Sequence, residues 1–182
     1  MAQHHLGFSG SITLKPTTLI LVIKDVVNSL ARHGFDHFYF LNGHGGNIAT
    51  INAAFSEGYA ESSLGQVPSN RPALRFKLRN WWSAEGAQQL SRRLYGGAEG
   101  SHATPSEVSL SYYAYPAAVK SVPLSPRLAP NGPIRDADDY RQQFPDGRIG
   151  SDPSLASIEH GERIYKAAVA DLACDYHCFV SV

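Results

Sequence analysis

The sequence predicts an α/β domain with a mostly parallel sheet. Its apolar residues form helix-like and strand-like segments in the order helix, strand, loop, helix, strand, which is typical of parallel crossover units. The chain has 182 residues, of which 43% are hydrophobic and 18% are charged. That length supports one buried core, and that composition is too apolar for a disordered chain. We therefore expect a single domain over residues 1–182.

The first helix is expected from Leu19 to about Arg32. Apolar residues recur at spacings of three and four between Leu19 and Leu30, which places them on one face of a helix. Pro16, Thr17 and Thr18 precede this pattern, so we expect a threonine to cap the helix. Residues 7–14 alternate small and apolar side chains and predict a loop that enters a short strand.

A strand, a loop, a helix and a second strand follow in turn. Residues 35–41 are short, aromatic and almost continuously apolar, as in a strand buried on both faces. The glycine-rich residues 42–47 form the next loop. A second amphipathic pattern predicts a helix over residues 48–62, and the alternation of residues 73–82 predicts the next strand.

The second half of the chain is expected to be mainly helical. Polar residues 85–95 and residues 105–113 predict two helices, separated by a glycine-bearing loop over residues 96–101. Residues 116–153 are rich in proline and predict a long irregular segment. An apolar stripe predicts a last helix that begins at residue 154.

The overall composition argues against several classes of protein. Sixteen basic and sixteen acidic residues give a net charge of zero, which offers no strong field to attract nucleic acid or an anionic membrane. The longest apolar run, residues 19–23, is too short to cross a bilayer. No secretory signal pattern opens the chain, and Cys174 and Cys178 are too few for a disulfide framework. We expect a soluble, cytoplasmic protein.

The loop Asn-Gly-His-Gly-Gly-Asn at residues 42–47 is the first candidate site. It follows a buried strand, so it lies at the carboxyl end of the sheet, where open α/β folds bind their ligands. His44 is the type of side chain that binds metals or acts as a general base. Gly45 and Gly46 allow the backbone to approach a ligand closely. The alternative is a simple glycine-rich turn with a histidine packed under it.

A second candidate site spans residues 99–107. His102 precedes the expected helix at Pro105, and the helix dipole there favours a neutral imidazole that can act as a base or a ligand. Glu107 falls in the first turns of the same helix. The alternative is purely structural: Ser101 or Thr104 caps the helix, and Glu107 complements its dipole.

Together these motifs resemble the creatininase (creatinine amidohydrolase) family. GFSGSITL at residues 7–14 is similar to the family's FPGTISL-like stretch, and NGHGGN follows it after a helix and a strand. His102-Ala103, with Glu107 five residues after the histidine, is similar to HAGExETS. The stretch GSDPSLAS at residues 150–157, with Ile-Glu-His-Gly directly after it, is similar to GDPSLATAEKG. This ordered set spans almost the whole chain and is more specific than any one motif.

The resemblance implies a three-layer α/β/α hydrolase fold with a divalent metal centre. Zinc, manganese or iron, as one ion or two, would activate a water that attacks the carbonyl carbon of an amide or formamide. By resemblance, His44 binds metal, Glu107 binds metal or substrate, and His102 acts as the general acid/base. It also implies a homo-oligomer and a small-molecule amide substrate.

The chain departs from the family pattern at several points. The family's first metal-binding block, a glutamate, a histidine two residues on and an aspartate, lies upstream of the GTISL stretch. Here only MAQHHL precedes Gly7, so we expect a domain that lacks this N-terminal block. His4-His5 resembles a family Glu-His pair, so we expect His5 to line the pocket, although a disordered terminus is equally compatible. Gly46 and Ala98 replace a glutamate and a tryptophan of creatininases, which argues against creatinine as the substrate.

Two functions are therefore considered for this chain. The first is a metal-dependent hydrolase of a non-peptide C–N bond, with His102 as acid/base, His44 and Glu107 as metal ligands, and Gly45, Gly46 and His5 in contact with substrate. The second is a truncated or degenerate family member that acts at most as a binding or scaffold protein. The lack of the upstream carboxylate block motivates this alternative.

Overall fold

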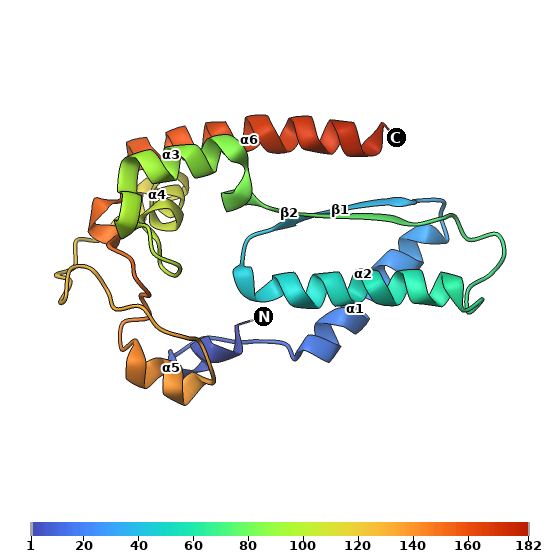
Figure 1. Ribbon diagram of the computed structural model, residues 1–182, viewed down its shortest axis with the longest axis horizontal. Coiled ribbons are helices and arrows are strands. Elements are labelled where there is room, and N and C mark those ends of the chain that lie inside the picture. Colours follow the sequence, from blue (N-terminus) through green and yellow to red (C-terminus); the bar gives the residue numbers. More distant parts are fainter. Residues whose placement is uncertain (1, 182) are drawn as a thin grey trace. The chain divides into compact units, whose positions relative to one another are not determined.

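The computed structural model describes residues 2–181, which divide into two compact units (Figure 1). The first, here called the strand unit, comprises residue 2 and residues 12–81 and 172–181. The second, here called the helical unit, comprises residues 3–11 and 82–171. Each unit has its own packing and carries its own part of the predicted motifs.

The strand unit contains the predicted parallel sheet. Its elements are α1 (Pro16–Ala31), β1 (His37–Asn42), α2 (Ile48–Ser63), β2 (Arg75–Asn80) and the C-terminal part of α6 (Ile158–Val180). Within the described chain the sheet consists of β1 and β2, which pair in parallel so that Asn42 lies opposite Asn80. The α/β prediction is therefore confirmed, and β1 and α2 lie where the sequence pattern placed them.

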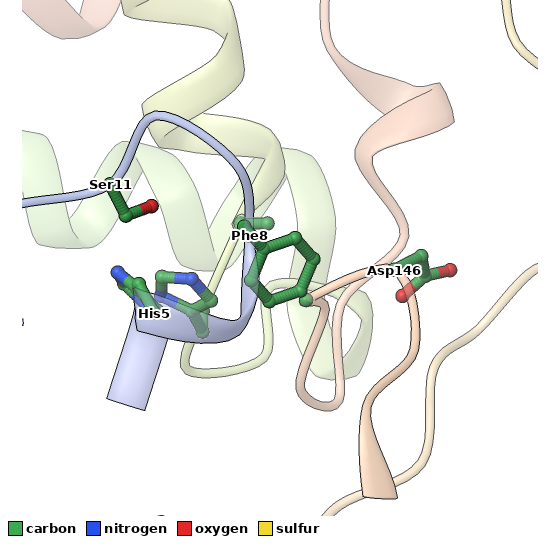
Figure 2. A pocket seen from close by; sticks show the side chains of 7 residues that line it. His5, Phe8, Ser11 and Asp146 are labelled. Carbon is green, nitrogen blue, oxygen red and sulfur yellow. The ribbon is translucent and has the colours of Figure 1, made fainter. Parts of the chain in front are cut away.

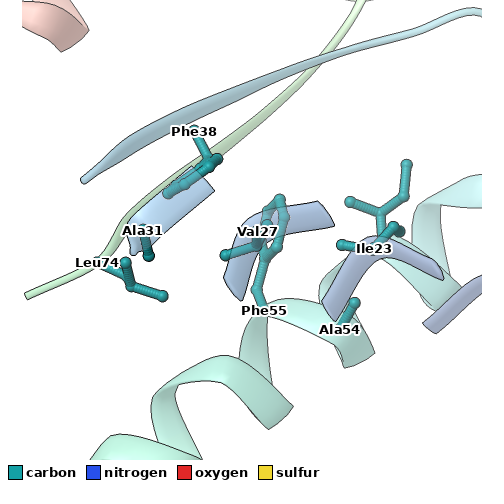
Figure 3. Packing of buried hydrophobic residues seen from close by; sticks show 8 residues of the cluster. Ile23, Val27, Ala31, Phe38, Ala54, Phe55 and Leu74 are labelled. Carbon is teal, nitrogen blue, oxygen red and sulfur yellow. The ribbon is translucent and has the colours of Figure 1, made fainter. Parts of the chain in front are cut away.

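One face of this sheet forms the apolar core with α1 and α2 (Figure 3). Phe38 and Phe40 of β1 and Phe76 of β2 point to this side, and the ring of Phe76 stacks on that of Phe55 with 4.7 Å between centroids. The buried members of the core are Ile23, Val27, Ala31, Phe38, Ile51, Ala54, Phe55 and Leu74. Burial of these side chains drives the association of both helices with the sheet.

The intervening strand residues carry polar groups and contact α6. Tyr39 donates a hydrogen bond of 3.0 Å to Asp175, and the ammonium group of Lys77 lies 2.8 Å from the same carboxylate. His37 packs edge-on against Phe179 with centroids 5.4 Å apart. Because side chains alternate along a strand, the two faces of the sheet acquire these different partners. The strand unit thus has helix, sheet and helix layers (Figure 1).

The helical unit is built from short helices around polar contacts. It contains η1 (Gln3–Gly7), α3 (Glu85–Tyr95), α4 (Pro105–Ala114), α5 (Ala137–Gln143) and the first part of α6. The Tyr95 hydroxyl lies 2.9 Å from Ser109 Oγ of α4 and 3.1 Å from His160 Nδ1 of α6. A second small core joins Tyr140 of α5, and Phe144 at the C-cap of that helix, to Ile149. Ile149 in turn forms an antiparallel bridge with His102.

Several local predictions were wrong. Residues 11–15 are irregular, and α1 begins at Pro16 with Lys15 as its N-cap, so neither the short strand nor a threonine cap forms. A strand needs a hydrogen-bonded neighbour, and the sheet of the described chain has β1 and β2 alone. Trp81 and Trp82 lie in the 3₁₀ turn η3 (Trp81–Ser83) that follows β2.

Two further boundaries differ in the second half. The proline-rich segment includes α5, a helix of seven residues that Asp136 caps by accepting bonds from the next turn. Residues 153–155 form the 3₁₀ turn η6 (Pro153–Leu155), so the last helix begins at Ile158 instead of residue 154. Across residues 2–181, no helix is both long and apolar enough to cross a membrane.

Candidate functional site

The predicted site residues lie in both units. His44, Gly45 and Gly46 belong to the strand unit, whereas His5, His102 and Glu107 belong to the helical unit. The structure brings His5 and His102 together at one pocket.

In the strand unit, Asn42 organises the loop that carries His44. Asn42 is 4% exposed at the end of β1. Its side-chain amide donates 2.8 Å to the His44 carbonyl and 2.7 Å to Asn80 Oδ1, while its own Oδ1 accepts from the His44 backbone and the Asn47 side chain. Asn42 and Asn47 therefore shape this loop, as their positions beside the glycines suggest.

The same loop leads directly into α2. His44 has an extended backbone (φ −148°, ψ 130°) and is the N-cap of η2 (Gly45–Asn47), which runs into α2 at Ile48. A Cβ on Gly45 would meet no atom within 4 Å, so Gly45 is open to an incoming molecule. Asn80 was not singled out from the sequence; the signal was its position at the end of the neighbouring parallel strand.

In the helical unit, backbone contacts hold the segment that carries His102. His102 and Ile149 form an antiparallel bridge, and Ser151 Oγ donates 2.7 Å to the His102 carbonyl. Gly100 (φ +68°) passes so close to residues 149–151 that a Cβ would lie 2.4 Å from the Gly150 carbonyl carbon. Only glycine fits this position without displacing the neighbouring strand segment.

His5 packs against His102 from η1. The two imidazole centroids are 4.6 Å apart, and His4, which is 5% exposed, lies 4.0 Å from His5 and 5.0 Å from the Tyr140 ring. His5 lies in the wall of a pocket beside His102, and its contact with a substrate stays a prediction. Burial, with a smaller contribution from the Asp146 carboxylate, raises the pKa of Tyr140 to about 12, so this hydroxyl stays protonated near neutral pH.

A pocket of about 250 Å³ opens beside these histidines (Figure 2). Besides His5 and His102, it is lined by Phe8, Ser11, Ala103, Asp146 and Gly147. Its volume is slightly below the roughly 300–1,000 Å³ of typical ligand pockets, which suits a small molecule. The walls offer imidazoles, a hydroxyl, a carboxylate and an aromatic ring, and they can orient a small polar ligand.

The sequence did not point to Phe8, Ser11 or Asp146 as pocket residues. Asp146 is held by the buried Arg148, whose Nε and Nη2 both lie 2.8 Å from Asp146 Oδ2. Burial alone would raise the pKa of Asp146, but these charged hydrogen bonds outweigh it and lower the pKa. The only sequence signal was the Pro145-Asp146-Gly147 turn pattern, which says nothing about a pocket formed with η1.

Glu107 forms part of the helix cap at the start of α4. Thr104 Oγ1 accepts from the Glu107 backbone at 3.1 Å, and Glu107 Oε2 accepts from the Thr104 backbone at 3.1 Å, which makes a capping box. Ser106 Oγ bridges this cap to Glu99 through a short hydrogen bond. Burial raises the pKa of Glu99 despite that bond. The structural alternative for Thr104 is therefore confirmed.

The residues of the described chain do not complete a metal site. Within residues 2–181, no three histidine, cysteine, aspartate or glutamate side chains gather in a way that could hold an ion. Divalent sites with protein ligands generally need three or four such groups. The described residues can contribute individual ligands but not a full set.

Comparison with known proteins identifies a family match. Residues 1–174 match the family model named creatininase, described as creatinine amidohydrolase. No curated protein sequence matches the chain significantly.

Several solved structures of creatininase share the fold. A tryptophan-to-phenylalanine variant of creatininase superposes with a TM-score of 0.71 at 22% identity and covers 92% of this chain and 66% of that structure. The manganese form of creatininase gives a TM-score of 0.69 at 23% identity, with the same coverages. A glutamate-to-glutamine variant in complex with creatine gives 0.71 at 23% identity and covers 95% and 69%. The chain thus spans about two thirds of the length of these structures.

Proposed function

Because the chain belongs to the creatininase family, we propose that it serves in the hydrolysis of a non-peptide C–N bond in a small amide or formamide. The observation that carries this proposal is the pocket in which the imidazoles of His5 and His102 meet, with centroids 4.6 Å apart. Its size admits a small molecule, and two imidazoles give it groups that exchange protons near neutral pH.

His102 is the general acid/base in this proposal. Hydrolysis of an amide needs a base that takes a proton from the attacking water and an acid that delivers a proton to the leaving nitrogen. One imidazole can perform both steps in turn. The bridge to Ile149 and the hydrogen bond from Ser151 fix the His102 backbone, which positions this residue at the pocket wall.

His5 and the glycine loop contribute to substrate binding in this proposal. His5 lies beside His102 and can hydrogen-bond to a substrate carbonyl or nitrogen. The space beside Gly45 is open, since a Cβ there would meet no atom within 4 Å. Gly45 and Gly46 would therefore let the loop backbone approach a substrate.

A divalent ion is a further part of the proposal, with His44 in the strand unit and Glu107 in the helical unit each proposed as a metal ligand. Zinc and manganese are the metals named for related creatininase structures, and iron binds similar ligands. Such an ion, as one centre or two, would polarise the substrate carbonyl. The described residues do not form the full ligand set.

The incomplete ligand set favours a second candidate function. A family member with His5 and His102 at a pocket, but without a metal ligand group in its described residues, would bind a small molecule and not turn it over. In that case the protein is a binding or scaffold module.

We also propose a cytoplasmic homo-oligomer as the working form. Cys174 and Cys178 are both exposed and do not form a disulfide with each other, which fits a reducing compartment. The homo-oligomer follows from the family resemblance alone, and sedimentation analysis tests it.

The deciding experiment compares metal-loaded and metal-depleted protein. The chain is incubated with zinc or manganese, or with a chelator, and then with a panel of cyclic and linear amides and formamides, with products detected by mass spectrometry. Hydrolysis that requires metal supports the enzyme, whereas binding without hydrolysis in every case supports the second candidate. Metal content of His44→Ala, measured by atomic emission, is expected to fall; full metal content and full turnover in this variant would refute the assignment of His44.

A further inference from the structure

The helical unit places an aromatic ring in the wall of the histidine pocket. Phe8 lines the same pocket as His5 and His102. In Figure 2 its ring stands between His5 and Ser11 on one side and Asp146 on the other.

The structure holds this ring in a fixed orientation. The guanidinium carbon of Arg141 lies over the Phe8 ring, 4.2 Å from its centroid, and Arg141 does not line the pocket. The Tyr140 ring meets Phe8 in a T-shaped contact at 6.2 Å. A fixed ring loses little side-chain entropy when a ligand packs on it.

The loop opposite is shaped to pass close to the ring. Gly147 has φ +83°, and a Cβ there would lie 3.3 Å from Phe8 Cζ. The Tyr140 hydroxyl donates 2.6 Å to the Gly147 carbonyl and anchors this loop. A larger residue at position 147 would therefore be strained and would press on the ring.

Phe8 is also connected directly to the histidines. Its backbone N–H donates 2.9 Å to the His5 carbonyl, and its carbonyl accepts from Ser11 at 3.2 Å. One turn of chain therefore sets the positions of His5, the Phe8 ring and the Ser11 hydroxyl together. A ligand that hydrogen-bonds to the polar groups of this wall is brought against the ring.

We propose that Phe8 is a specificity-determining residue, whose ring selects ligands that present a planar, conjugated amide-containing ring to the histidine pocket. This inference rests on the proposed function only where the selected ligand is taken to be a substrate. The selectivity itself is a property of binding. Aromatic rings prefer offset or edge contacts with other flat π-systems, and a puckered ring of the same polar groups loses that contact. Phe8 thereby adds shape selection to the hydrogen bonding of the neighbouring polar groups.

A matched pair of probes tests the proposal. Uracil and 5,6-dihydrouracil carry the same ring amide groups, but only uracil is planar. Their dissociation constants are measured by titrating ¹⁵N-labelled protein and following the backbone signals of Ala103 and Gly147, which line the pocket. We expect the wild-type protein to prefer uracil by about threefold to tenfold, the range that an aromatic contact provides.

Variants at position 8 separate the effect of the aromatic ring from the effect of side-chain size. Phe8→Leu keeps an apolar side chain and should bring the affinity ratio close to one, while Phe8→Tyr should retain the preference for uracil. Phe35→Leu, an identical change at an exposed phenylalanine of the strand unit, should leave the ratio unchanged. If Phe8→Leu fails to fold by circular dichroism, Phe8→Met supplies a flexible side chain of similar size.

The outcomes distinguish this inference from the proposed function. A wild-type ratio near one, an unchanged ratio in Phe8→Leu or Phe8→Met, or no binding of either probe at the pocket overturns the role of Phe8. A planar preference that depends on Phe8 supports it, even in a protein that hydrolyses no amide. Hydrolysis without the preference refutes the inference and leaves the proposed function standing.

Discussion

Replacing Gly161 with alanine tests the packing of α4 against α6 in the helical unit. Gly161 is buried in α6, and a Cβ there would lie 2.0 Å from the Ser109 carbonyl oxygen and 2.8 Å from Tyr113 Cβ, both on α4. Real Cβ atoms do not approach other atoms within 3.0 Å. The two helices must therefore move apart in the variant.

The size of the effect follows from the contacts at this crossing. Overpacking a well-packed contact costs roughly 1–3 kcal/mol. Separation also strains the bonds of Ser109 Oγ, which accepts from the Ser157 backbone at 3.1 Å and lies 2.9 Å from the Tyr95 hydroxyl; each contributes about 1 kcal/mol. The helix preference of alanine over glycine offsets about 1 kcal/mol. We expect Gly161→Ala to lower the free energy of unfolding by about 2–4 kcal/mol.

The assay is equilibrium unfolding in urea, followed by circular dichroism. Gly97→Ala is the control, because a Cβ at Gly97 would meet no atom within 4 Å, and its free energy of unfolding should stay within about 0.5 kcal/mol of the wild-type value. An unchanged or higher urea midpoint for Gly161→Ala would show that the described helix crossing is wrong.

Three further changes probe the surroundings of the pocket. Gly100→Ala should lower the melting temperature and weaken binding at the pocket. Gly100 has φ +68°, and a Cβ there would overlap the backbone of residue 150. A wild-type melting temperature would contradict this. The pKa of Tyr140 is raised to about 12 from the ordinary 10.0, so the folded protein holds the Tyr140 proton to higher pH than the unfolded chain does. The stability that this provides is complete below pH 10 and is lost as pH rises toward 12. That loss amounts to at most about 2.7 kcal/mol, and Tyr140→Phe should show a flatter dependence in unfolding titrations above pH 9. Burial alone would raise the pKa of Asp152, but hydrogen bonds from Ser154 and Arg127 lower it below 3.8. Asp152→Asn should therefore lower the stability at pH 7, and the deficit should shrink as pH falls below 4. A deficit that stays constant with pH would exclude this linkage.

The strand unit could be predicted largely from local patterns. The apolar spacing of α1 and the aromatic run of β1 determine which side chains reach the core, and the structure places them there. Parallel pairing of β1 with β2 follows from the intervening helix α2. Errors concentrate at boundaries: Pro16 starts α1 because proline is favoured in the first helical turn.

The pocket could be predicted only in part. His102 was singled out by its position before the helix at Pro105, and His5 by the motif resemblance. Their proximity is a tertiary feature, because it brings η1 against the segment bridged with Ile149. Phe8 and Asp146 reach the same pocket from segments far apart in sequence. No periodicity links such positions, because their meeting depends on the packing of α5 against η1 and not on local propensity.

Glu107 illustrates how one residue can satisfy two patterns. Its spacing from His102 resembles a family motif, and its spacing from Thr104 is that of a capping box. The structure shows the cap. The metal role of Glu107 rests on the resemblance alone.

The central claim is that His102 performs proton transfer in hydrolysis at the helical-unit pocket. The most direct test is kcat/KM of His102→Gln against the wild-type protein, with the amide that the panel identifies and under the same metal loading. His33→Gln, at an exposed histidine of the strand unit, is the control. We predict a fall of about 10²- to 10⁴-fold for His102→Gln and none for His33→Gln. A wild-type kcat/KM in His102→Gln would contradict the claim.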